Sequence, residues 1–206
     1  VLIIAALFLI SGLCLIAFYD KHELHLIINS FNNDFFDSFF SIITFFGDGL
    51  IAILIVLLIS IWSFRNSIIT LTSFLLSGII VQIFKHLIYP QAMRPAKLFQ
   101  EEGIDIHLIE GVNQHSYHSF PSGHTAAAFA VFLSLAFIVK NKILKIFLSF
   151  FAVLVAFSRV YLSQHFVVDI VTGAFIAIIS VIFAFLWLKD KKQNFMSLSF
   201  LKLIKK

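Results

Sequence analysis

Six long apolar runs dominate this 206-residue sequence and restrict what it can fold into. They cover residues 1–19, 39–64, 67–87, 121–139, 143–162 and 166–188. Asp48 stands between two glycines near the start of the second run, so we expect that span to begin at about Gly49. A helix of about 20 residues crosses a hydrocarbon core of ~30 Å, and each run has roughly that length. Hydrophobic residues make up 60% of the chain and charged residues only 13%, unlike the composition of soluble domains. We therefore expect an all-α membrane protein with six transmembrane helices.

The remaining segments complete the expected layout. Residues 20–38 mix polar and aromatic side chains, with apolar residues spaced for one helix face, which is typical of a helix lying in the membrane interface. An ordinary loop is the alternative for this segment. We expect a six-span domain over residues 1–190 and a basic tail over residues 191–206 that lies against anionic headgroups. The first run lacks a basic start and a cleavage site, so we interpret it as a retained span.

The distribution of basic residues predicts the orientation in the membrane. Six spans place both chain ends on one side, which carries most of the lysine and arginine: Arg65, Lys140, Lys142, Lys145, Lys189, Lys191, Lys192, Lys202, Lys205 and Lys206. This excess predicts cytoplasmic termini. The loop at residues 88–119 and the turn at residues 158–166 then face outward, which in a bacterial inner membrane is the periplasmic side. The net charge of +4 is small, and we expect no nucleic-acid partner.

A polar stretch, residues 117–125, stands directly before the fourth apolar run. We expect residues 121–125 to form the first helical turn, where Pro121 is tolerated because the N–H groups there have no intrahelical partner. Those N–H groups and the helix dipole favour an anion. Gly123 permits close approach, Ser122 adds a hydroxyl, and His124 can transfer a proton near neutral pH. A plain helix cap is the alternative to a phosphate site.

A second histidine lies between the fifth and sixth runs, in residues 158–169. His165 and Asp169 are four residues apart, so we expect them on one helix face. A carboxylate there accepts a hydrogen bond from Nδ1–H of His165 and leaves the Nε2 lone pair free, which is how a neutral histidine becomes a nucleophile. A purely structural pair is the alternative. An unpaired carboxylate inside a span is costly, which favours a function for Asp169.

Three cations are expected at the same outward depth: Lys85, Arg94 and Arg159. Ammonium and guanidinium groups suit phosphate oxygens, and guanidinium can bind them in a bidentate manner. The alternatives are snorkelling side chains for Lys85 and Arg159 and a plain loop turn for Arg94. The presence of all three cations and both histidines on one side of the membrane favours a phosphate site.

These stretches resemble the three motifs of the type 2 phosphatidic acid phosphatase superfamily, usually written K-x6-R-P, P-S-G-H and S-R-x5-H-x3-D. The second motif stands intact at residues 121–124 and the third at residues 158–169. In the first motif, eight residues instead of six separate Lys85 from Arg94. Lys97 is therefore an alternative to Lys85 as the phosphate-binding lysine.

The resemblance implies a metal-independent phosphohydrolase that acts on a membrane lipid phosphate or diphosphate at the outer face. In this mechanism His165 attacks phosphorus and forms a phosphohistidine, Asp169 orients His165, and His124 protonates the leaving oxygen and then activates water. The groups expected to hold the phosphate oxygens are Lys85, Arg94, Ser122, Gly123 and Arg159. The candidate substrates are undecaprenyl diphosphate, phosphatidylglycerophosphate, phosphatidic acid and lipid A phosphates.

We expect no metal and no other cofactor, because the cations and the helix N-terminus supply positive charge. The spacing of His115, His118 and His124 fits no helical metal pair, and Cys14 is the single cysteine. Beyond the bilayer and the lipid substrate no partner is predicted, and the oligomeric state stays open. Three rival functions remain: a lipid phosphotransferase, a non-catalytic lipid-binding protein on the same fold, and a haem- or metal-binding bundle.

Overall fold

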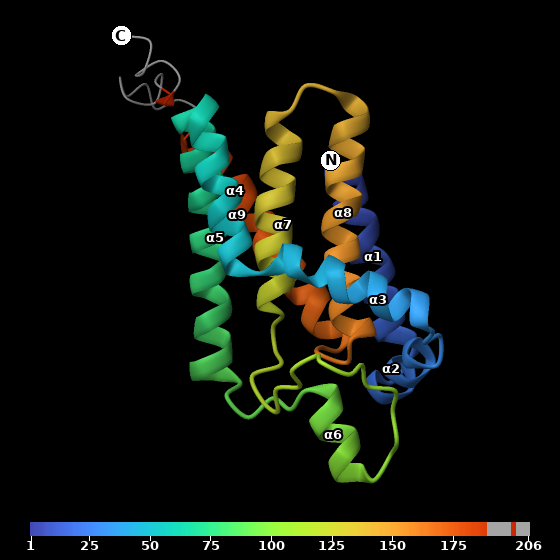
Figure 1. Ribbon diagram of the computed structural model, residues 1–206. Helices are drawn as coiled ribbons and strands as arrows, with labels where there is room; N and C mark the ends of the chain where they lie inside the picture. Colours follow the sequence, from blue (N-terminus) through green and yellow to red (C-terminus); the bar gives the residue numbers. More distant parts are fainter. Residues whose placement is uncertain (189–198, 201–206) are drawn as a thin grey trace.

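The computed structural model describes residues 1–188, 199 and 200, and its helices run mostly along one axis (Figure 1). The elements are α1 (Leu2–Phe18), α2 (Lys21–Asn29), α3 (Asp34–Ile43), the 3₁₀ turn η1 (Thr44–Gly47), α4 (Gly49–Trp62), α5 (Phe64–Ile83), the π turn η2 (Phe84–Ile88), α6 (Pro95–Glu102), α7 (Gly123–Ile138), α8 (Lys142–Tyr161) and α9 (Val167–Leu188). No strand occurs in the described residues, which confirms the all-α prediction for them. The predicted tail at residues 191–206 lies almost wholly outside these residues.

The helices are those of an integral membrane protein, although the expected count of six spans is not reached by length and composition. Within the described residues, three helices are long and apolar enough to cross a membrane: α5 with η2, α8 and α9. Two bent pairs raise the number to five: α1 with α2, bent by 114°, and α3 and η1 with α4, bent by 59°. Helix α7 is apolar but has only 16 residues. The six-span prediction therefore stays a prediction.

Two aspartates that cap helices stand at the two bends. Asp20 ends the first run and accepts a hydrogen bond from the backbone N–H of His22 at 2.7 Å, which starts α2 in a new direction. Asp48 does the same for α4 by accepting from the N–H of Leu50 at 2.7 Å. The apolar run at residues 39–64 is thus divided between α3, η1 and α4, and α4 begins at Gly49, as expected from the position of Asp48.

Helix α7 forms the centre of the bundle and packs against α5, α8 and α9. Its residues are buried almost all round, and many are alanines, which allow neighbouring helices to approach closely. The closest approach is at Gly173 of α9, where a Cβ atom would lie 2.5 Å from the carbonyl oxygen of Ser122. This packing fixes the N-terminus of α7, and with it the P-S-G-H stretch, against the start of α9.

The segment expected in the membrane interface forms two helices instead of one. Helix α2 buries Leu24, His25 and Asn29, and α3 crosses the bundle at a steep angle to α8 (Figure 1). The long loop that contains α6 lies at the end of the bundle opposite the turn between α7 and α8 (Figure 1). The three motif stretches all reach the end that carries this loop.

Candidate active site

The His165–Asp169 pair forms as predicted from its spacing, but His165 is not on the helix. It lies in the turn before α9, with Nδ1 3.3 Å from Oδ2 of Asp169. The helix starts after it because the same Oδ2 accepts the backbone N–H of Phe166 at 3.0 Å, as an acidic residue in the first turn of a helix often does. Asp169 therefore caps α9 and orients His165 at once.

Ser119 is a member of this cluster that the sequence motifs do not include. Its hydroxyl donates to Oδ2 of Asp169 at 2.5 Å and lies 3.5 Å from Nδ1 of His165. All three side chains are buried. Ser119 occupies the loop before the P-S-G-H motif and approaches Asp169 through the tertiary fold, so no local pattern in the sequence could have identified it.

The surroundings of His165 keep its imidazole neutral. Burial lowers the pKa of His165 well below 6.5, and the cations Arg94, Arg159 and Lys85 and the nearby His124 lower it further. In the neutral ring, the proton on Nδ1 faces the carboxylate of Asp169, which leaves Nε2 as the atom with a lone pair. A neutral imidazole with a fixed tautomer is the form needed for attack on an electrophile.

The P-S-G-H stretch begins α7, although the helix starts two residues later than expected, at Gly123 instead of Pro121. Ser122 is the N-cap and its Oγ accepts the N–H of Thr125 at 3.4 Å, so Pro121 precedes the helix and Gly123 is its first residue. His124 then stands in the first turn and lines a cavity of about 520 Å³. The free first-turn N–H groups point to the same end of α7, where an anion is favoured.

The three predicted cations lie around this cavity or within electrostatic range of it. Arg94 and Arg159 line it, and Lys85 is buried, with Nζ donating to the carbonyl oxygen of His118 at 2.8 Å. Lys85 lies in the π turn η2, in which the backbone N–H of Tyr89 donates to the carbonyl oxygen of Phe84 at 2.7 Å. A π turn accommodates an extra residue, so it takes up part of the longer Lys-to-Arg spacing.

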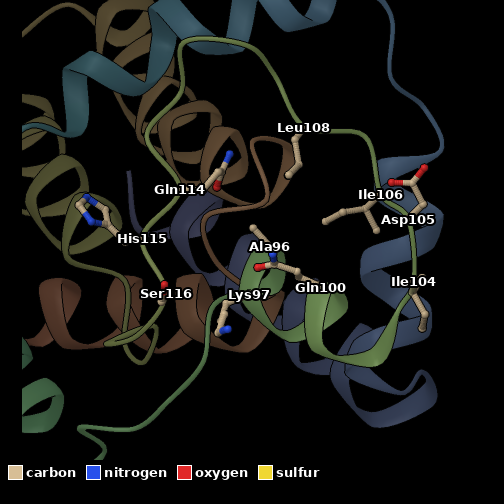
Figure 2. A pocket seen from close by; sticks show the side chains of 10 residues that line it. All are labelled: Ala96, Lys97, Gln100, Ile104, Asp105, Ile106, Leu108, Gln114, His115 and Ser116. Carbon is tan, nitrogen blue, oxygen red and sulfur yellow. The ribbon is translucent and has the colours of Figure 1, made fainter.

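Lys97, the alternative lysine, faces a different space. It lies on α6, forms an ion pair with Glu101 at 3.1 Å and lines an outer pocket of about 300 Å³ (Figure 2). This pocket lies between α6 and the loop at residues 104–116 (Figure 2). Of its lining residues, His115 also lines the cavity with His124. Neither lysine lines that cavity, but Lys85 is within electrostatic range of Arg94, Arg159 and Asp169, which favours Lys85 as the phosphate-binding lysine.

One wall of the cavity comes from η1 and the start of α4, which no motif predicted. Thr44 accepts a hydrogen bond from Nη1 of Arg159 at 2.5 Å, and Asp48 also lines the cavity. Gly47 packs directly on the first turn of α7, because a Cβ atom there would lie 2.9 Å from the carbonyl oxygen of His124. The bend between α3 and α4 thus serves to bring this wall against the site.

The partners of the cationic side chains at this site are neutral oxygens: Arg94 and Arg159 donate to backbone carbonyls, to the hydroxyl of Thr44 and to the amide of Gln164. Nε of Arg159 is buried and has no hydrogen-bond partner within the part of the chain that the structure describes. Burial lowers the pKa of Arg94, and Asp169 opposes that shift. In the described residues, no group of three or more His, Cys, Asp or Glu side chains is placed to hold a metal ion. The arrangement can bind a tetrahedral oxyanion between the arginines and the start of α7.

Comparisons with known proteins agree with this geometry. The chain is 27% identical over 169 residues to the undecaprenyl-diphosphatase BcrC of Bacillus subtilis. The aligned residues cover 77% of this chain and 79% of that protein. It superposes on the crystal structure of Aquifex aeolicus LpxE with a TM-score of 0.69 and 27% identity, over 79% of this chain and 92% of the other.

A second solved structure extends the likeness of fold to nearly the whole chain. This is a transmembrane PAP2-type phosphatidylglycerolphosphate phosphatase from Bacillus subtilis, with a TM-score of 0.67 and 22% identity, over 94% of this chain and 98% of the other. The sequence profile of the PAP2 superfamily matches residues 66–193, which include all three motif stretches. The resemblance inferred from those motifs is thereby confirmed, and the chain belongs to the PAP2 superfamily.

Proposed function

We propose that this protein removes a phosphate group from a membrane lipid phosphate or diphosphate through a phosphohistidine at His165, without a metal ion. Its family makes it a lipid phosphatase. The observation that carries the mechanism is the buried His165–Asp169 pair beside a cavity lined by His124 and two arginines. This combination supplies a nucleophile, a proton donor and an oxyanion site in one place.

The first half of the reaction transfers the phosphoryl group to the protein. The Nε2 lone pair of His165 attacks phosphorus, the bond from phosphorus to the leaving oxygen breaks, and protonated His124 gives that oxygen its proton. Asp169 balances the positive charge that develops on His165. In the second half, neutral His124 takes a proton from water, the resulting oxygen nucleophile attacks phosphorus, and the N–P bond breaks to release phosphate.

The phosphate oxygens are held by groups whose charge is present before the reaction. The cationic donors are Lys85, Arg94 and Arg159. Neutral donors at the start of α7 are the hydroxyl of Ser122 and the backbone N–H of Gly123. Preorganised donors of this kind stabilise the charge of the transition state without reorganisation during the step. The same charges explain why no metal ion is required by the proposed mechanism.

The site is proposed to face outward from a bacterial inner membrane, with six spans and cytoplasmic termini. The described part of the lysine and arginine excess supports this orientation. Arg65 lies at the start of α5, and Lys140, Lys142 and Lys145 lie at the turn between α7 and α8, the end of the bundle opposite the loop with α6 (Figure 1). In this arrangement α1 together with α2 forms one span, α3 and η1 together with α4 form another, and α7 crosses the membrane as a shorter helix. A lipid headgroup would then reach the cavity from the outer leaflet.

The substrate is proposed to be a lipid with a terminal phosphate or diphosphate. The similar proteins support this class, since one is an undecaprenyl-diphosphatase and another a phosphatidylglycerolphosphate phosphatase. The candidates remain undecaprenyl diphosphate, phosphatidylglycerophosphate, phosphatidic acid and lipid A phosphates. A lipid phosphotransferase is the rival, because a lipid hydroxyl in place of water would complete the same second step.

The proposal is tested by phosphate release from the purified protein in detergent across a panel of these lipids, with and without EDTA. We expect release from at least one lipid in the absence of any acceptor lipid, no inhibition by EDTA and inhibition by vanadate. Release that requires a second lipid alcohol would identify a phosphotransferase instead. Loss of activity with EDTA that added Mg²⁺ restores would contradict the metal-independent mechanism.

A further inference from the structure

The side chain of Gln164 lies between the two arginines of the site. It is 1% exposed, and its Oε1 accepts hydrogen bonds from Nη1 of Arg94 at 2.9 Å and from Nη2 of Arg159 at 3.4 Å. Its Nε2 donates to the carbonyl oxygen of Asn113 at 2.9 Å and to Oε1 of Gln114 at 2.6 Å. One amide group therefore joins both guanidinium groups to the outer loop.

The chemistry of this contact suits the binding of an anion by the arginines. Two buried guanidinium groups repel each other, and an acceptor shared between them lowers the cost of holding them together. A neutral amide oxygen does this without cancelling their charge, whereas a carboxylate would form an ion pair and compete with phosphate. The Nε atom of Arg159 is buried and has no hydrogen-bond partner in the described part of the chain.

The position of Gln164 in the chain adds to this arrangement. It directly precedes His165, and the backbone N–H groups of both residues donate to the carbonyl oxygen of Arg159 at 3.0 Å. The turn before α9 therefore holds both the proposed nucleophile His165 and the amide of Gln164 that lies between the two arginines. Asn113 is exposed and lines the cavity with His124, and Gln114 lines the outer pocket, so the amide of Gln164 also fixes the loop between the two spaces.

We propose that Gln164 is a positioning residue that sets the spacing of Arg94 and Arg159 for the phosphoryl group and anchors both to the loop at residues 113–114. It acts through the arginines and the loop, and takes no part in bond making. The role rests on the proposed phosphohydrolase function, since it is phosphate oxygens that the arginines are spaced to hold.

Three variants of the full-length protein test the proposal. Gln164→Met keeps the volume and removes all four hydrogen bonds, and Gln164→Glu keeps the shape and adds a charge between the arginines. The matched control is Gln100→Glu, an exposed residue of α6 that lines the outer pocket. The measurements are kcat and KM for a lipid phosphate, the Kd of vanadate and of inorganic phosphate, and the melting temperature in detergent.

We expect Gln164→Met to lower kcat by ~10–100-fold and to weaken vanadate binding by a similar factor, which is the range for lost hydrogen bonds to charged groups. Gln164→Glu should weaken inorganic phosphate binding by roughly tenfold or more, because a carboxylate pairs with the arginines. Gln100→Glu should leave every value within about twofold. A melting temperature close to that of the parent protein is expected for Gln164→Glu, which keeps the packing.

A double-mutant cycle separates positioning from general loss of structure. If Gln164 acts through Arg94, then Gln164→Met should cost little more in a background that already carries Arg94→Ala. Additive losses in this cycle, or unchanged vanadate binding in both Gln164 variants, would overturn the proposal. Vanadate binding needs no turnover, so a parent protein that binds vanadate but releases no phosphate would refute the proposed function while the Gln164 role is still decided.

Discussion

Oδ2 of Asp169 lies 3.3 Å from Nδ1 of His165, and the same oxygen accepts hydrogen bonds from the hydroxyl of Ser119 and the N–H of Phe166. One carboxylate oxygen thus contacts the proposed nucleophile His165, a loop hydroxyl and the start of α9. A shared acceptor of this kind holds all three groups in one geometry. A substitution of Ser119 in the loop can therefore alter the position of His165 through Asp169.

Removing the Ser119 hydroxyl should therefore impair catalysis more than substrate binding. We expect Ser119→Ala to lower kcat by ~10-fold with KM almost unchanged, because Asp169 loses one of the donors that fix it. Steady-state kinetics on a lipid phosphate check this. Ser116→Ala, an exposed serine of the outer pocket, is the control and should keep full kcat. Equal rates for the two variants would show that Asp169 is held without Ser119.

The choice between the two lysines is open to a direct comparison. Lys85 is buried near the arginines, whereas Lys97 lines the outer pocket and pairs with Glu101. We expect Lys85→Ala to reduce kcat/KM by on the order of 10²-fold through lost transition-state stabilisation, and Lys97→Ala to change it less than threefold. The reverse order of effects would assign the phosphate-binding role to Lys97.

Because Gly173 packs against the backbone of Ser122, any side chain at position 173 should destabilise the protein. A Cβ atom there would lie 2.5 Å from the carbonyl oxygen of Ser122, so Gly173→Ala should cost about 2 kcal/mol and displace the start of α7. Thermal unfolding in detergent and kcat measure the two effects. Gly78 of α5 is the matched control, because a Cβ atom there has no atom within 4 Å and Gly78→Ala should leave both values intact or raise stability. Equal behaviour of the two variants would argue against this packing.

The acid limb of the pH profile should report the neutral state of His165. Burial and the cations Arg94, Arg159 and Lys85 lower its pKa below 6.5, so the imidazole stays unprotonated at pH 6.5 and gains a proton only as the pH falls further. We expect the acid limb of kcat/KM, which reports groups of the free enzyme, to have its midpoint below pH 6.5. Arg94→Gln should move this midpoint upward. A midpoint above 6.5 that Arg94→Gln leaves in place would contradict the assignment.

The local parts of the fold could be predicted from the sequence, because they depend on local patterns. The apolar runs located most of the helices, and the motifs located His124, His165 and Asp169. The end of the first run at Tyr19 and the start of the second span at about Gly49 were predicted and agree with α1 and α4. The changes of direction at Asp20 and Asp48 were not predicted, because hydropathy does not register a change of direction. Pro121 was placed in the first turn of α7, whereas Ser122 caps that helix.

The residues that surround the motifs could not be predicted in this way. Ser119, Thr44 and Asn113 meet the site through contacts between segments far apart in the chain, and nothing in their local sequence marks them. Gln164 stands inside the third motif, but only the fold shows that its amide lies between two arginines. Sequence patterns thus identified the groups proposed to act on phosphate, and the tertiary structure identified those that position them.

The central claim is that His165 carries the phosphoryl group during turnover. The most direct measurement is rapid quenching of the purified protein with a lipid phosphate at high pH, where phosphohistidine survives, followed by mass spectrometry of the peptide that contains residues 158–169. The account predicts a phosphoryl group on His165 in the parent protein, and neither that group nor phosphate release in a folded His165→Asn variant. Continued phosphate release by His165→Asn, or a phosphoryl group on another residue, would contradict it.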